Sequence, residues 1–460
     1  MTTIVERRKG RWIDNYDPEN KEFWEREGKG IANRNLWFSI LAEHLGFSIW
    51  TMWSVMVLFM GPAYGLSPAD KFFLVSAVTL VGSCVRIPYS FAVAKFGGRN
   101  WTIVSTLLLL IPTVSAGFVI QPGTSFDTFL IVACLAGFGG GNFASSMMNI
   151  NTFYPEGRKG WALGLNAGGG NIGVATIQLV GLLILSVAGA GEPKLVLWVY
   201  IPLIAVAAVC AALFMDNLTD VKNDKKAFRE VMKDGHTWVM SFLYIGTFGS
   251  FIGYSFAFGL VLQNQFGRTP VQAAAVTFLG PLLGSLFRPP GGWLSDRIGG
   301  AKVTLGVFLG LALSTVLCIL ASEAKSLPLF TIGFILLFVF AGIGNGSTYK
   351  MIPSIFQAKA KVAIEAGEPE SVALPRARRL SGALIGLAGA IGAAGGLFIN
   401  LAFRESFLSA KSGVPAFVAF LIFYGVCVVV TYVVYLRKPA TQSAAEDAPT
   451  GKVAMVAANV

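Results

Sequence analysis

The chain has 460 residues, a length that would give two or three domains in a soluble protein. Charged residues make up only 13% of it and hydrophobic residues 54%, more apolar surface than a soluble core can bury, so lipid surrounds most of the chain. The net charge of +11 would also suit a nucleic-acid binder, and the positions of the basic residues decide between the two.

A polar start is followed by apolar stretches long enough to cross a bilayer. Residues 1–35 contain no short apolar region with a cleavage site, so we expect a cytoplasmic N-terminal segment rather than a signal peptide. Apolarity then predicts twelve membrane spans and an all-α integral membrane protein. The predicted spans are 36–60, 72–94, 101–120, 127–152, 161–188, 195–215, 237–263, 271–294, 302–322, 327–349, 380–403 and 414–436.

The most polar stretch between spans divides them into six and six. We therefore predict a first six-helix bundle over 36–216, a cytoplasmic linker over 217–236 and a second bundle over 237–437. The Ala-rich, sparsely charged residues 438–460 are predicted to form a disordered cytoplasmic tail.

The basic residues are distributed unevenly between the two sides of the predicted membrane. Of the 36 Lys and Arg, 28 fall on the side of the N-terminal segment, six fall on the opposite side, and Arg86 and Arg288 lie inside spans. This bias places both termini in the cytoplasm and predicts a multi-pass protein of the cytoplasmic (inner) membrane, with lipid as its partner. Because topology accounts for most of the charge, we expect no nucleic-acid binding.

The two halves share a spaced pattern. Arg86 and Arg288 are each followed, 11 residues later, by a Gly-Gly pair, and Asn142 and Asn345 each precede a phenylalanine by 11 residues. The offsets between halves are 202 and 203 residues. We therefore predict two pseudo-symmetric six-helix bundles in parallel orientation, with a substrate site between them near the middle of the membrane.

Three formal charges lie deep in apolar spans, and they indicate an anion site. They are Glu43, Arg86 and Arg288, with His44 beside the first. An intramembrane arginine costs at least about 2.5–3.5 kcal/mol, so each one needs a partner or a wet cavity. One alternative is that both arginines pair with acids or helix-end carbonyls; however, with one deep acid, at least one arginine lacks a carboxylate. Two planar guanidinium forks suit a small planar oxyanion.

Glycine runs in spans five and eleven have two compatible interpretations. Small residues let helices approach closely, and side-chain-free surfaces also let two halves slide during a rocking motion. Gly168 and Gly389 lie in these runs, and Asn171 would add an uncharged polar contact. We predict all three as part of the substrate site.

The residues for a metal or cofactor site are few. All five cysteines lie in predicted spans without metal-ligand spacing, and there are two histidines, so we expect no metal, no cofactor and no enzyme activity. An anion channel and a porter for another small anion remain alternatives. We take a monomer as the working expectation.

Several segments closely resemble the NarK-type nitrate/nitrite porters of the major facilitator superfamily. They are Arg86-Ile-Pro-Tyr-Ser-Phe, Asn142-Phe-Ala-Ser-Ser-Met, the two glycine runs, LYIGTFGSFIG around Tyr244 and GWLSDRIGG from Gly292 to Gly300. The resemblance covers nearly the whole chain, although AVAKFGGR, the first-half copy of the last motif, lacks its aspartate.

This resemblance implies secondary transport of nitrate and nitrite, with a role in nitrate assimilation. Arg86 and Arg288 would clamp the anion, Phe143 and Phe248 would cover its faces, and the Tyr244 hydroxyl would donate a further hydrogen bond. Taken alone, the two phenylalanines would indicate only lipid or core contacts.

The sequence leaves two ways in which nitrate uptake could be driven. Importing an anion into a negative cell costs about 2.3 kcal/mol per 100 mV, so uptake needs proton symport or exchange for another anion such as nitrite. Glu43 projects near the level of Tyr244 through the repeat offset and, with His44, suits a proton carrier. AEHLGFSIWTMWSV around this pair resembles the proton-linked branch. We therefore expect nitrate/proton symport, with nitrate/nitrite antiport and a merely charge-compensating Glu43 as the alternatives.

Overall fold

The computed structural model describes residues 6–189, 191–221 and 224–437, and these are almost entirely helical. Twelve helical segments among them are long and apolar enough to cross a membrane. The first six are α1 to α2 (Lys21–Phe23, η1 Trp24–Gly28, Lys29–Phe59), α3 (Pro68–Phe96), α4 and α5 (Gly98–Leu108, Leu110–Val119), α6 and α7 (Phe126–Ala136, Phe138–Phe153), α8 (Glu156–Ala188) and α9 (Lys194–Phe214).

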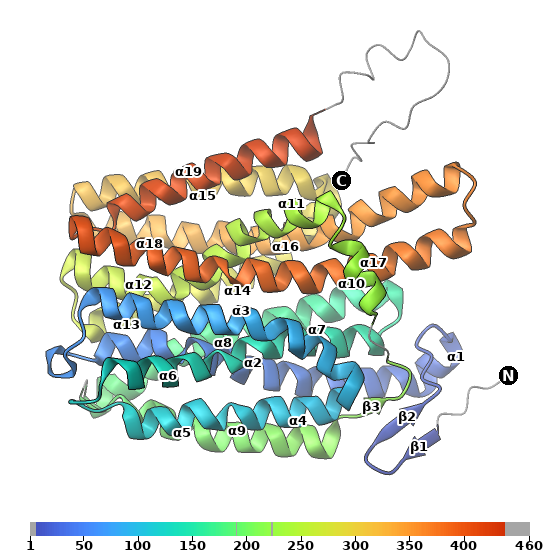
Figure 1. Cartoon of the computed structure of the whole chain (residues 1–460), viewed down its shortest axis with the longest axis horizontal. Helices are drawn as coiled ribbons and strands as arrows, with labels where there is room; N and C mark the ends of the chain where they lie inside the picture. The colour runs from blue at the N-terminus through green and yellow to red at the C-terminus, as the bar shows by residue number, and fades with distance from the viewer. Residues whose placement is uncertain (1–5, 190, 222–223, 438–460) are drawn as a thin grey trace, which may run out of the picture.

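The second six follow the linker in the same manner. They are α11 to α12 (Gly235–Tyr244, η3 Ile245–Gly249, Ser250–Phe266), α13 and α14 (Pro270–Thr277, Leu279–Ile298), α15 (Gly300–Glu323), α16 (Leu327–Glu365), α17 and α18 (Glu370–Ala393, Gly395–Ala410) and α19 with η4 (Val414–Thr431, Tyr432–Leu436). The predicted all-α fold with twelve spanning helices in two halves is confirmed. Figure 1 shows the first half in blue to green on one side and the second half in yellow to red on the other.

The two halves meet along several pairs of helices, among them α2 and α12. The helix α3 contacts α17 and α18, and α8 contacts α13 and α14. The described chain begins and ends at the same end of the molecule (Figure 1), which we call the hairpin end after its N-terminal β-hairpin. The opposite end is called the distal end.

Helices extend beyond the stretches that hydropathy predicts. The predicted first span begins at 36, whereas helical structure begins at Lys21, where the Asn20 side chain accepts a hydrogen bond from the backbone N–H of Phe23. Likewise α16 continues to Glu365, well past the predicted end at 349. Hydropathy reports the part of a helix that lipid can surround, while backbone hydrogen bonding continues into the polar region.

A small sheet at the hairpin end was not predicted. The strand β1 (Glu6–Arg8) pairs antiparallel with β2 (Trp12–Asp14), and β2 pairs in parallel with β3 (Asn217–Leu218), which is the start of the linker. The N-terminal segment is therefore attached to a part of the chain about 200 residues away.

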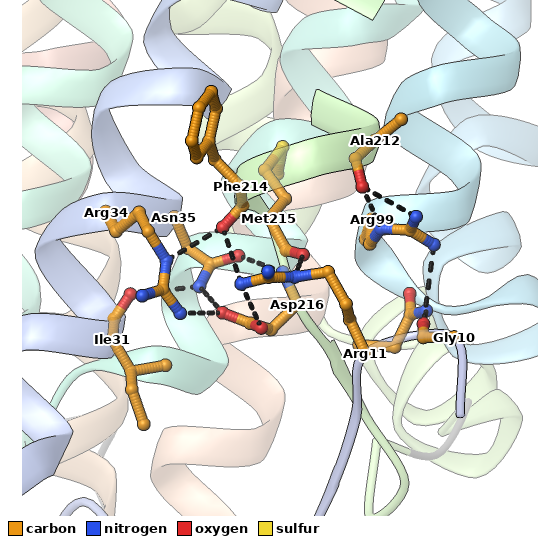
Figure 2. Close-up of polar contacts among 11 residues, drawn as sticks. Gly10, Arg11, Ile31, Arg34, Asn35, Arg99, Ala212, Phe214, Met215 and Asp216 are labelled. Carbon is orange, nitrogen blue, oxygen red and sulfur yellow. Dashed lines mark hydrogen bonds and ion pairs between the residues drawn. The ribbon is translucent and has the colours of Figure 1, made fainter. Parts of the chain in front are cut away.

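Four residues beneath this sheet form a polar cluster, which we call the Asp216 cluster: Arg11, Arg34, Asn35 and Asp216 (Figure 2). The Asp216 carboxylate, almost fully buried, accepts hydrogen bonds from Arg11 at 2.8 Å, Arg34 at 2.6 Å and Asn35 at 2.9 Å. Both arginines also donate to backbone carbonyls at the end of α9. The cluster joins the N-terminal segment, α2 and α9 of the first half.

The predicted linker over 217–236 contains β3 and a short helix, α10 (Lys225–Val231), and α11 begins at Gly235. Arg379 of α17 forms ion pairs with Asp224 at 3.3 Å and Glu230 at 2.8 Å, and the Phe228 ring lies 5.6 Å from that of Phe91 in α3. The linker thus contacts both halves. The predicted tail over 438–460 lies outside the described residues.

At the distal end, the two halves touch directly. The Phe72 ring of α3 stacks on the rings of Phe403 and Phe407 in α18, with centroids 5.7 and 5.5 Å away. Nearby, Gln263 of α12 donates a hydrogen bond of 2.8 Å to the carbonyl of Leu58 in α2. These contacts close the space between the halves at this end.

Candidate functional site

The two predicted intramembrane arginines lie on the two helices that α17 and α8 contact across the interface. Arg86 is in α3 and Arg288 is in α14, and their side chains are buried, with 1% and 5% exposed. Prolines inside both helices, Pro88 and Pro289, follow the arginines directly or within two residues. Each half thus contributes one buried guanidinium to the same region.

Arg86 is held by backbone carbonyls from both halves. Its Nε donates to the Gly140 carbonyl of α7 at 3.1 Å, and its Nη1 donates to the Gly389 carbonyl of α17 at 2.9 Å. The alternative of carbonyl partners is therefore partly realised for Arg86. Its Nη2 is buried and has no hydrogen-bond partner within the described part of the chain.

Arg288 has fewer partners. Its Nη2 lies 3.5 Å from the Tyr244 hydroxyl, and its Nη1 is buried without a partner among the described residues. In residues 6–189, 191–221 and 224–437, no carboxylate oxygen lies within 4.0 Å of either guanidinium. Two desolvated cations with unused donors in one place can bind a small anion with planar oxygen acceptors.

Aromatic rings surround the arginines. The rings of Phe143 (α7) and Phe248 (η3) stack at 6.0 Å with an angle of 26°, and the Arg86 Cζ lies 4.7 and 4.9 Å from their centroids. Tyr244 stacks in turn on Phe248 at 5.3 Å and 8°. Tyr244 and Phe248 reach the site at the point where α11 passes into the π-helical turn η3, a local geometry that is frequent at functional sites.

A cavity extends from this group toward the hairpin end. About 40 Å³ of it admits the centre of a water molecule, which at roughly 10–15 Å³ per water is room for a few waters. Its lining comes from both halves: Arg86, Phe143, Ala144, Met147, Met148, Asn151, Leu163, Tyr349, Gly382, Ile385, Gly386 and Gly389. Asn151 is two residues from the end of α7, so the cavity runs from Arg86 to the hairpin end of the bundle.

Glu43 lies in a separate hydrogen-bonded group within the first half. It is completely buried, and its Oε2 accepts a hydrogen bond of 2.7 Å from Asn166 of α8. Asn166 also donates to the Ser146 hydroxyl at 2.5 Å, and this hydroxyl lies 3.0 Å from that of Ser39. The Glu43 Oε1 has no partner within the described residues. Glu43 therefore does not neutralise either arginine by direct contact.

His44 points to a different neighbour. Its Nδ1 lies 3.1 Å from the carbonyl oxygen of Gly169 in α8. Because a carbonyl only accepts hydrogen bonds, this nitrogen carries the proton. His44 is thus anchored to the α8 backbone beside Gly170, where any side chain would overlap the Glu43 carboxylate.

Comparison with known proteins gives the family of the chain. A family model described as Major Facilitator Superfamily matches residues 36–397, most of the chain. The chain belongs to the major facilitator superfamily. With twelve spanning helices and bacterial relatives, this facilitator is a multi-pass protein of the inner membrane.

Relatives of this facilitator are named as nitrate/nitrite transporters. It is 41% identical over 94% of its length to the nitrate/nitrite transporter NarU of Salmonella typhimurium, covering 97% of that protein. Identity is 38% to NarU of Escherichia coli over the same shares. It is 36% to the probable nitrate/nitrite antiporter NarK2 of Thermus thermophilus, over 76% of this chain and 84% of that protein. The resemblance to this porter family is confirmed, as is the expectation of a transporter rather than an enzyme.

A solved structure has the same fold. A bacterial homologue of the human lysosomal transporter Spinster, inward-facing and unoccupied, superposes with a TM-score of 0.62 over 88% of this facilitator and 97% of that chain. At 18% sequence identity, the likeness concerns the fold alone.

The structure brings most of the predicted anion-site residues of this facilitator together. Arg86, Arg288, Phe143, Tyr244, Phe248 and Gly389 form one group. A Cβ at Gly389 would lie 3.3 Å from the Tyr349 hydroxyl and 3.9 Å from the Arg86 Nη1, so this glycine borders the site. Their roles remain predictions.

Gly168 and Asn171 have no contact of this kind among the described residues. A Cβ at Gly168 would meet no atom within 4 Å, and the side chain of Asn171 is buried without a hydrogen-bond partner. Their assignment to the substrate site also remains a prediction.

Two aromatic residues at the site were missed in the sequence. Tyr349 of α16 lines the cavity, with its ring centroid 5.1 Å from the Arg288 Cζ, and the Trp50 ring lies 5.2 Å from the Arg86 Cζ. The repeat gives Tyr349 a counterpart in the first half but no signal for an aromatic residue at the site. The offset of 203 that matches Asn142 with Asn345 also matches Ser146 with Tyr349.

Proposed function

We propose that this facilitator transports nitrate and nitrite by alternating access between its two bundles. The observation that carries the proposal is the pair of buried guanidiniums, one from each half, that keep unused donors without a carboxylate partner. An anion that binds both at once couples the two halves. The names of relatives that match 94% of the chain support nitrate and nitrite as the anions.

We propose the following roles for the site residues, which their geometry supports. The Arg86 Nη2 and Arg288 Nη1 donate to the anion in its plane, and the Tyr244 hydroxyl adds a donor. The rings of Phe143 and Phe248 cover its faces. A planar ion between two rings needs a centroid separation of about 7 Å, since carbon contacts lie near 3.5 Å. The present centroid separation is 6.0 Å, so the two rings must move slightly apart when the ion enters.

The end toward which the cavity opens indicates which conformation of the transport cycle this structure represents. We place the hairpin end in the cytoplasm, because most basic residues lie on that side. The cavity opens toward this end while Phe72, Phe403 and Phe407 close the distal end, so the conformation is inward-facing. The bundles span 36–216 and 237–437, and rocking between them exposes the arginines to either side.

For coupling we propose nitrate/proton symport, with Glu43 as the proton carrier and His44 beside it. Support comes from the complete burial of Glu43 and from its unpartnered Oε1, which is available to hold a proton. Nitrate/nitrite antiport without protons is the second candidate. It is favoured by the name of the Thermus relative, a probable antiporter.

Proteoliposomes with purified protein separate the two couplings. We expect an inward pH gradient to drive nitrate uptake without internal nitrite, and Glu43→Gln to abolish this uptake, because glutamine cannot carry the proton. Exchange of internal for external nitrate should persist in Glu43→Gln, since it needs no net proton movement.

Glu405→Gln is the control, because Glu405 is exposed near the distal end and pairs only with its half-buried neighbour Arg404 among the described residues, so the change should leave uptake unchanged. Gradient-driven uptake that survives in Glu43→Gln would contradict the role of Glu43. Wild-type uptake that responds only to internal nitrite would establish the antiport.

A further inference from the structure

The site holds one more buried donor that the proposed roles leave unused. Within the described residues, the Tyr349 hydroxyl is buried and, like the Arg86 Nη2 and the Arg288 Nη1, makes no hydrogen bond of good geometry, although the Tyr244 hydroxyl lies close to it. Tyr349 belongs to α16 of the second half and lines the cavity together with Arg86. A buried hydroxyl without an acceptor is unfavourable, so its presence beside two unpaired arginines calls for a ligand that accepts from it.

The ring and the hydroxyl of Tyr349 contact different parts of the site. Its ring lies against Arg288, with the Cζ 5.1 Å from the centroid, and beside Tyr244, with centroids 5.0 Å apart. Its hydroxyl reaches toward Gly389, 3.3 Å from where a Cβ would stand, and the Gly389 carbonyl holds Arg86. The hydroxyl therefore reaches the Arg86 side of the cavity from a ring that contacts Arg288.

We propose that the Tyr349 hydroxyl donates a hydrogen bond to the third oxygen of nitrate and so makes the site prefer nitrate to nitrite. This inference rests on the proposed function. Two guanidiniums approaching from opposite halves, with the Tyr244 hydroxyl beside Arg288, can satisfy two oxygens of a planar ion. Nitrate has a third oxygen that needs a donor, whereas nitrite has none. A site built to donate to that oxygen discriminates against the ion that lacks it, because the donor is then left unpaired.

Tyr349→Phe tests the hydroxyl alone, since the ring and its contact with Arg288 are kept. In proteoliposomes we expect the KM for nitrate to rise about 5- to 10-fold, the effect of one hydrogen bond. The KM for nitrite and both kcat values should stay within about twofold. A second readout is the stabilisation of purified protein by nitrate and by nitrite in thermal unfolding, where only the nitrate effect should weaken.

Tyr200→Phe is the matched control. Tyr200 of α9 is also buried with an unpartnered hydroxyl within the described residues, but it does not line the cavity. This variant should transport both anions like the wild type.

The assignment is overturned if Tyr349→Phe leaves the KM for nitrate unchanged, or if it shifts nitrate and nitrite by the same factor. Failure of the proposed function looks different, since the wild-type protein would then transport neither anion.

Discussion

Arg86 and Arg288 are buried in similar positions but are held differently. Arg86 donates to a carbonyl from each half, so it bridges the two bundles before any anion binds. Among the described residues, the hydrogen bonding of the Arg288 side chain is limited to a long contact of 3.5 Å with the Tyr244 hydroxyl. The guanidinium fork, and not charge alone, explains this arrangement, because Arg86 uses two of its five N–H groups on carbonyls and still has its Nη2 for a ligand.

Lysine at either position keeps the charge but loses the fork. We expect Arg86→Lys and Arg288→Lys each to lower kcat/KM for nitrate by at least about tenfold, as charge-assisted hydrogen bonds are worth roughly 1.5–3 kcal/mol. Initial rates of nitrate uptake into proteoliposomes measure the effect.

The control for both is Arg268→Lys, since Arg268 lies outside the cavity and donates to the Phe266 carbonyl. Near-normal transport in both site variants would contradict the assignment of Arg86 and Arg288 as the residues that bind the anion.

Most of the candidate site could be predicted at the level of residues. Arg86 and Arg288 stand out because charge inside an apolar span is costly, and the repeat links them. Phe143 and Phe248 carry no such signal, because a phenylalanine in a membrane helix is ordinary. Their stacking beneath Arg86 depends on three helices meeting, which only a family resemblance could indicate.

At the scale of elements, the spans were predictable and their ends were not. Lipid-facing length follows from hydropathy, but the start of the first helix at Lys21 depends on a local cap by Asn20. The sheet of β1, β2 and β3 depends on pairing across about 200 residues, and strands of two or three residues leave no periodic pattern. The Asp216 cluster was missed for the same reason.

Asp216 provides a test of this N-terminal attachment. We expect Asp216→Ala to lower the stability of the purified protein by about 1.5–3 kcal/mol, because the carboxylate accepts from three side chains. Thermal unfolding in detergent measures the loss.

Asp220→Ala is the comparison, since Asp220 is an exposed acid four residues further along, in the linker. Equal thermal stability of both variants would show that the Asp216 cluster adds little.

At the scale of the whole molecule, the two ends differ. The stacked rings of Phe72, Phe403 and Phe407 close the distal end, together with the hydrogen bond from Gln263 to the Leu58 carbonyl. The cavity opens at the hairpin end. Alternating access requires the distal contacts to break in each cycle.

A disulfide across the distal end tests this requirement. A Cβ at Gly259 would lie 3.2 Å from the Leu58 Cγ, so cysteines at both positions have Cβ atoms within reach of a disulfide. We expect oxidation of a Leu58→Cys/Gly259→Cys variant, made with the native cysteines replaced, to stop nitrate uptake, and a reductant to restore it.

Each single-cysteine variant should be insensitive to oxidation. Full uptake in the cross-linked protein would show that transport does not require the distal end to open.

The short linker has a mechanical consequence. Its first residues, β3, are fastened to the first bundle through the N-terminal hairpin, and α10 is fastened to the second by Arg379. Between Leu218 and Lys225 only six residues intervene, a contour of about 25 Å at most when fully extended. The N-terminal hairpin thus fixes one end of the linker to the first bundle. We infer that, by holding Asn217 in place, it limits how far the bundles separate at this end, and that they would separate further without it.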